Sequence, residues 1–157
     1  MNEPYRIEDE PLPSSLDKSA VNPLFPLLGL MFGGAWLAWP WFAFNAAAMG
    51  SPTRKREWQI VAGALLGSMV LALLVIWADR EHVVSTYTVR FAILGLQVWK
   101  LGCAYKLQTM QSRTFELFEY YGGTPRNGLV LVIASSLLRS VVLGLVEGNL
   151  FLLLVLA

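Results

Sequence analysis

The chain has 157 residues, of which 55% are hydrophobic and only 15% are charged, and its mean hydropathy is +0.52. Soluble domains carry about 25% charged residues, so this composition is typical of a protein whose main solvent is lipid. The formal net charge of +1 gives no bulk electrostatic signal for nucleic acid. A single cysteine, Cys103, and a single histidine, His82, exclude an internal disulfide and a zinc site built from several Cys and His ligands.

The first 21 residues are polar and acidic. They are interrupted by three prolines and lack the apolar core of a cleavable signal peptide. Their acidic residues are Glu3, Glu8, Asp9, Glu10 and Asp17. Such a composition buries too little apolar surface to fold, so the sequence predicts a disordered tail over 1–21. The remainder, 22–157, is predicted to form one transmembrane domain.

Four apolar runs are long enough to cross a bilayer as helices. They cover about 23–48, 57–77, 84–107 and 128–156. A polar residue followed by proline is typical of a helix start, and three of the runs follow such a pair: Asn22-Pro23, Ser51-Pro52 and Thr124-Pro125. Pro40 lies inside the first run and predicts a kink there. The sequence therefore predicts an all-α, polytopic membrane protein with four transmembrane helices.

The stretch between the third and fourth runs is amphipathic. From Gln108 to Tyr121, apolar residues recur at steps of three and four, and Gln111, Glu116 and other polar residues fill much of the opposite side. This pattern predicts a helical segment that lies along the cytoplasmic membrane surface. Gly122-Gly123 is expected to end it.

Basic residues set the expected orientation. One side of the predicted bundle carries Arg54, Lys55, Arg56, Lys106, Arg113 and Arg126. The other side carries Arg6, Lys18 and Arg80. By the positive-inside rule, the connection over 50–56 is expected in the cytoplasm and both termini outside.

Small residues recur four positions apart in three of the runs, a spacing that lets helices approach one another closely. The pairs are Gly29 and Gly33, Gly63 and Gly67, and Gly144 and Gly148. These are more close-packing faces than a four-helix monomer needs. The pattern therefore favours a homo-oligomer or a membrane protein partner.

Four charged residues stand inside the apolar runs, where each is costly and needs a partner. They are Arg90, Lys100, Arg139 and Glu147. Counting the helix rise of about 1.5 Å per residue, Arg90 and Glu147 lie at depths where they can form an ion pair. Lys100 is expected to snorkel to the cytoplasmic interface, and Arg139 to face the bundle interior or water.

This charge cluster has three open interpretations. The charges can lock the register of the helices. They can form a pocket for an anionic group, such as a lipid head group or an acidic substrate. They can also form a proton or ion pathway, because Glu147 is the only carboxylate expected inside the bilayer.

Two glycine-rich patterns resemble an uncharacterised family of small bacterial integral membrane proteins. The residues that carry the resemblance are Phe32-Gly33-Gly34-Ala35, Asn45, Gly50, Leu107-Gln108, Phe115 or Phe118, and Gly122-Gly123. The resemblance covers roughly residues 22–157, and it departs from the family at Ala35, where a proline is expected. It implies a location in the bacterial inner membrane and no particular activity.

The sequence contains no recognisable catalytic, cofactor-binding or metal-binding pattern. Zinc protease chemistry needs an HExxH pair, and intramembrane aspartyl chemistry needs two carboxylates. We therefore expect neither an enzyme nor a cofactor. The first functional hypothesis is a non-enzymatic interaction or accessory protein that packs through its small-residue faces. The alternative is a small transporter, or a binder of anionic lipid or another ligand, that uses Arg90, Lys100, Arg139 and Glu147.

Overall fold

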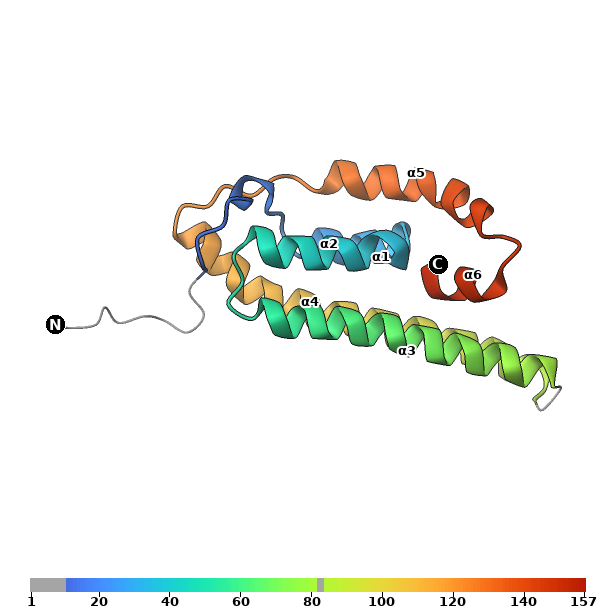
Figure 1. Ribbon diagram of the computed structural model, residues 1–157. Coiled ribbons are helices and arrows are strands. Elements are labelled where there is room, and N and C mark those ends of the chain that lie inside the picture. The colour runs from blue at the N-terminus through green and yellow to red at the C-terminus, as the bar shows by residue number, and fades with distance from the viewer. Residues whose placement is uncertain (1–10, 82–83) are drawn as a thin grey trace.

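The computed structural model describes residues 11–81 and 84–157. Within those ranges the chain forms helices and no β-strand, which confirms the all-α prediction. The elements are η1 (Asp17–Ser19), α1 (Leu24–Phe32), α2 (Ala35–Ala48), α3 (Arg54–Arg80), α4 (Thr86–Tyr120), α5 (Leu129–Leu145) and α6 (Leu150–Leu156). The long helices α3, α4 and α5 run along the molecule, and the shorter ones pack between them (Figure 1).

The first apolar run is two helices that form a hairpin. Gly34 has a φ of +108°, which glycine adopts at low cost, and the chain reverses there (Figure 1). Gly29 of α1 lies against the ring of Trp41 of α2, so the two helices pack along their length. The chain therefore reverses at the glycine pair and not at Pro40, which lies within α2. The single helix predicted over 23–48 is thus wrong.

Residues 11–21 close the open end of this hairpin. The backbone N–H of Leu12 donates to the carbonyl oxygen of Gly50 at 2.7 Å, and Val21 exchanges two hydrogen bonds with the side chain of Asn45. Val21 is also buried. The predicted disorder is therefore wrong for this part of the N-terminal segment, and the first ten residues lie outside the described ranges.

Helices α3 and α4 form the longest pair in the molecule and lie side by side (Figure 1). Among the described residues, α3 is the helix that is both long and apolar enough to cross a membrane. Helix α4 continues without a break to Tyr120, so the segment predicted to lie on the membrane surface is the end of α4. Its polar residue Gln111 is fully buried, and the Gln111 amide donates a hydrogen bond to the carbonyl oxygen of Phe42.

The last apolar run is also two helices. Helix α5 ends at Leu145, and α6 folds back into the bundle toward the α1–α2 turn (Figure 1). Asn149 begins α6, because its side-chain oxygen accepts a hydrogen bond from the backbone N–H of Leu152 at 3.2 Å. Leu154 of α6 packs in an apolar cluster with Ala72 of α3. The single helix predicted over 128–156 is therefore wrong.

The surface of α3, α4 and α5 is largely apolar. Leu66, Leu74, Phe91, Leu137 and Leu145 are among the many large apolar side chains that are more than half exposed. Several polar or charged side chains are instead buried: Asn45, Glu57, Ser68, Lys100, Gln111, Thr114 and Ser135. A soluble protein exposes the second kind of residue and buries the first. The distribution therefore favours lipid as the solvent of these helices.

Candidate functional site

Two short elements meet end to end in the middle of the bundle. The α1–α2 hairpin enters from one end of the molecule and α6 from the other (Figure 1). A Cβ atom at Gly34, in the hairpin turn, would lie 2.8 Å from the carbonyl oxygen of Leu156. The turn of the hairpin therefore touches the last turn of α6, and both helix ends expose backbone groups there.

This meeting point is level with the middle of α3. Trp99 of α4 packs on Gly67, where a Cβ atom would lie 2.6 Å from the indole ring. The indole Nε1 of Trp99 also donates to the carbonyl oxygen of Ala64 at 3.3 Å. Gly67 is the midpoint of α3. Lys100, which follows Trp99, therefore lies about 20 Å from each end of α3, at about 1.5 Å per residue.

Lys100 is directed into the protein. Its side chain is 1% exposed, and its Nζ donates to the carbonyl oxygens of Leu154 at 2.7 Å and Ala157 at 3.3 Å. The carbonyls of a last helical turn have no partner within the helix, and they form the negative end of its dipole. Lys100 therefore supplies hydrogen bonds that the last turn of α6 lacks. The prediction that it snorkels to the interface is wrong.

Arg139 of α5 lies beside the last residue of α1, in the α1–α2 hairpin. Its side chain is half-buried, and Nη1 lies 3.5 Å from the carbonyl oxygen of Phe32, the last residue of α1. One turn earlier on α5, Ser135 packs on Gly33, where a Cβ atom would be 2.5 Å from the Ser135 hydroxyl oxygen. This close approach holds α5 against the α1–α2 turn. The prediction that Arg139 faces the bundle interior or water agrees with this position.

Lys100 and Arg139 face one cavity of about 240 Å³. The side chain of Gln97 adds an amide to its wall, and the remaining residues that line it have apolar side chains: Leu30, Met31, Leu101 and Ala157. The two cations repel one another, and no acidic side chain of the described residues lines the cavity, although Ala157 contributes its main-chain oxygen to the Lys100 hydrogen bonds there. Two cations without a facing acidic side chain make this a site where an anion would be favoured.

The other two members of the predicted charge cluster do not join this site. Arg90 is exposed in the second turn of α4, and Glu147 is exposed in the connection between α5 and α6. No ion pair within 4.0 Å joins these two residues, so the predicted pairing is not formed. The cluster of four charges therefore separates into a pair at the cavity and two exposed charges.

The six glycines predicted to pack helices also divide into two groups. A Cβ atom would meet another side chain within 4 Å at Gly29, Gly33 and Gly67. Nothing lies within 4 Å of a Cβ at Gly63, Gly144 and Gly148. The first group therefore serves contacts within this chain, and the second faces away from it.

A buried carboxylate that the sequence did not single out lies at the start of α3. Glu57 is fully buried; one carboxylate oxygen accepts from the amide of Gln111 at 2.8 Å, and the other accepts from the hydroxyls of Ser51 and Thr53. The carboxylate is thus held by three neutral donors. In the sequence, Glu57 follows three cations and has the pattern of an exposed interfacial residue, so no local signal indicates its burial.

Asn45 extends this polar network to the N-terminal segment. Its amide donates to the side-chain oxygen of Gln111 at 3.1 Å, and the Gln111 amide also donates to the carbonyl oxygen of Phe42 at 2.9 Å. The same Asn45 side chain bonds the backbone of Val21. Since its members satisfy one another, the network joins four segments of the chain and leaves little capacity for a ligand.

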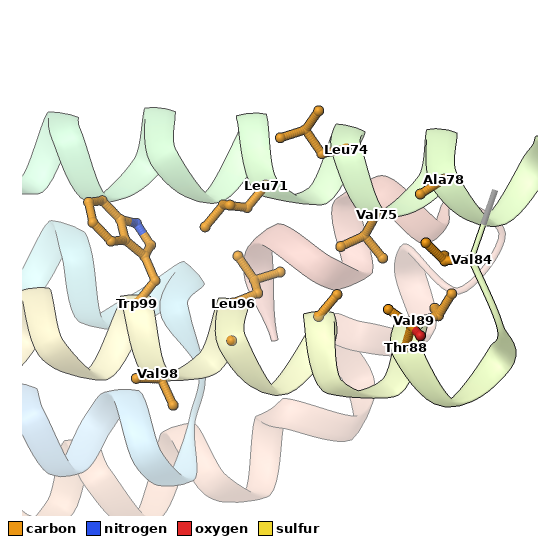
Figure 2. A pocket seen from close by; sticks show the side chains of 12 residues that line it. Leu71, Leu74, Val75, Ala78, Val84, Thr88, Val89, Leu96, Val98 and Trp99 are labelled. Atoms are coloured by element: carbon orange, nitrogen blue, oxygen red, sulfur yellow. The ribbon is translucent and has the colours of Figure 1, made fainter.

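A second, larger cavity of about 570 Å³ lies between the C-terminal half of α3 and the N-terminal half of α4 (Figure 2). Leu71, Leu74 and Val75 of α3 line one side, and Leu96 and Trp99 of α4 line the other. Its lining is almost wholly apolar, with one hydroxyl from Thr88. Such a cavity offers at most one directed polar contact, so the Lys100–Arg139 cavity is the better candidate for selective binding.

Comparison with known protein families, with curated proteins and with solved structures finds no match to this chain. The resemblance to an uncharacterised bacterial membrane family therefore stays a prediction.

Proposed function

We propose that the chain is a multi-pass membrane protein in which α3, α4 and α5 cross the bilayer. The α1–α2 hairpin and α6 then enter the bilayer from opposite sides and meet near its middle. The apolar outer faces of the long helices support this arrangement. So do Lys100 and Arg139, because irregular backbone at membrane depth is tolerated where protein groups satisfy it or where it lines a cavity. Three crossings and two partial ones replace the four crossings expected from hydropathy.

The proposed orientation follows from the basic residues. The N-terminal segment, the Arg54–Arg56 turn and Arg126 lie at one end of the molecule, since Leu12 bonds Gly50 and the Arg126 backbone N–H donates to Ala20. By the positive-inside rule this end faces the cytoplasm. In a bacterium the membrane would be the inner one. Residues 11–21 are then cytoplasmic, in place of the external N-terminal tail expected from the sequence.

The function that the geometry supports best is the non-enzymatic binding of an anionic group at the Lys100–Arg139 cavity. One observation carries this proposal: two cations, one of them fully buried, face the same cavity, and no acidic side chain of the described residues lines it. A ligand there would be held by charge-assisted hydrogen bonds in surroundings of low dielectric, where such bonds are strongest. Binding alone, or binding as a step of transport, would use this site in the same way.

Thermal unfolding in mild detergent tests this proposal. A ligand that binds the folded state raises the unfolding temperature. The full chain would be titrated with chloride, acetate, inorganic phosphate and phosphatidylglycerol. We expect at least one anion to stabilise the wild type and to lose most of this effect in Arg139→Leu. The exposed Arg90→Leu variant is the matched control and should respond like the wild type. Equal responses in both variants, or none at all, would refute anion binding at this site.

A second candidate function is association with other membrane helices, which the open glycines favour. A Cβ atom placed at Gly63, Gly144 or Gly148 would meet no other part of the chain within 4 Å, although small residues at this spacing commonly mark helix contacts. Native mass spectrometry of the detergent-solubilised protein would detect a defined oligomer or a bound second protein. We expect Gly144→Leu to abolish that species, whereas Gly102→Leu, at another open glycine, should retain it. A lone monomer with no crosslinked partner would remove this candidate.

A further inference from the structure

We infer that the anionic group is a short organic acid taken from the aqueous phase, and not the head group of a bilayer lipid. The inference rests on the proposed anion-binding function. It depends on four properties of the Lys100–Arg139 cavity: its size, its free hydrogen-bond donors, its apolar walls and its depth.

The size of the cavity limits the ligand. Its volume is about 240 Å³. One water molecule occupies about 30 Å³ of liquid, so the cavity holds roughly eight non-hydrogen atoms. The cavity is partly open to the surface, so a lipid would leave its acyl chains outside, whereas a short organic acid fits within the cavity as a whole.

The free donors match a carboxylate. Arg139 carries five N–H groups, and one of its terminal nitrogens contacts the Phe32 carbonyl, so most of its planar fork is free. Lys100 has three N–H groups and directs two of them at the carbonyls of Leu154 and Ala157, which leaves one. The two oxygens of a carboxylate fit the guanidinium fork, and the remaining Lys100 proton can reach the same group.

The apolar walls favour an organic body over a bare inorganic ion. Leu30, Met31 and Leu101 also line the cavity. Inorganic phosphate would lose water against these side chains without gaining hydrogen bonds, which is costly. A hydrocarbon portion would instead gain from leaving water. The lining of the cavity is therefore amphiphilic.

The depth of the site separates a soluble acid from a lipid. Lys100 is level with Gly67 at the midpoint of α3. The hydrocarbon core of a bilayer is about 30 Å thick, so head groups begin about 15 Å from its middle. A lipid phosphate would have to leave the interface and descend through that distance. A soluble acid carries no acyl chains that hold it at the interface.

Calorimetry with benzoate tests the inference, because benzoate has about the size that the cavity admits. The full chain in mild detergent would be titrated with benzoate, with its neutral analogue benzamide and with inorganic phosphate. The same chain in nanodiscs would be tested for retained phosphatidylglycerol. We expect wild-type protein to bind benzoate and to bind benzamide at least about tenfold more weakly, since a hydrogen bond to a charged group contributes that much. This comparison needs no variant to fold.

The variants locate the binding. Arg139→Gln should weaken benzoate binding by at least about tenfold. Arg139→Lys keeps the charge and loses the fork, so its affinity should lie between those of the wild type and Arg139→Gln. The exposed Arg90→Gln variant should match the wild type. Equal binding of benzoate and benzamide would overturn the inference. Binding of phosphate or phosphatidylglycerol through Arg139, without benzoate, would overturn it and keep the proposed function. Binding of none of these anions would overturn both.

Discussion

Lys100 and Leu154 are 54 residues apart in the chain, and the Lys100 Nζ donates a hydrogen bond of 2.7 Å to the Leu154 carbonyl oxygen. This contact joins the middle of α4 to the last turn of α6. It also explains how a short helix can end inside the bundle, because the cation satisfies carbonyl groups that no residue of α6 can reach. In a similar contact, Nη1 of Arg139 lies 3.5 Å from the carbonyl oxygen of Phe32 at the end of α1.

The first prediction concerns Lys100 itself. Replacing Lys100 with Met preserves most of the apolar stem and removes the ammonium group, so the carbonyls of Leu154 and Ala157 lose their partner. We expect the free energy of unfolding in detergent to fall by about 1–3 kcal/mol. The exposed Arg90→Met change should alter it by less than about 0.5 kcal/mol. Equal effects of the two variants would show that the buried contact contributes nothing.

The second prediction concerns the buried Glu57 network. Glu57→Leu leaves the amide of Gln111 and the hydroxyls of Ser51 and Thr53 without their acceptor. We expect destabilisation by about 1–3 kcal/mol. Gln111→Leu should have a comparable effect, and the double variant should be less destabilised than the sum of the two, because both changes break the same network. Strict additivity in a denaturant titration would contradict this coupling.

The third prediction tests the turn of the α1–α2 hairpin. Gly34→Ala places a side chain at a φ of +108° and about 2.8 Å from the Leu156 carbonyl oxygen. We expect it to destabilise the protein by about 1–3 kcal/mol. Gly102→Ala is the matched control, since Gly102 is helical and nothing lies within 4 Å of its Cβ position. That change should be neutral or should stabilise α4 by up to about 1 kcal/mol. The opposite ranking in thermal unfolding would reject the hairpin turn.

The fourth prediction tests the side of the membrane on which each end lies. In a Cys103→Ala background, single cysteines would replace Asp17, Lys55 or Glu147, all of which are exposed. A membrane-impermeant maleimide applied to intact cells should label the cysteine at 147 and leave those at 17 and 55 unlabelled. Permeabilised cells provide the control that all three can react. Labelling of position 17 but not position 55 would mean that 23–48 crosses the membrane once.

Much of the helix content could be predicted from hydropathy and spacing. The run over 57–77 lies within α3, and Gly122-Gly123 ends α4 as the pattern indicates. Gly33 and Gly67 mark close contacts, as small residues at this spacing commonly do. Lys100 and Arg139 were recognisable as candidate site residues because a charge in an apolar run needs a partner.

What the sequence determined by itself is therefore the helical class of the chain, its apolar character and which charged residues require partners. Those properties follow from local composition and periodicity. The tertiary structure alone decided that 23–48 and 128–156 turn back, since apolar residues suit a crossing helix and a hairpin equally well. It also decided that Lys100 and Arg139 share a cavity while Arg90 and Glu147 stay exposed. Such choices depend on which backbone groups the folded chain leaves unsatisfied, and these exist only after distant segments pack together.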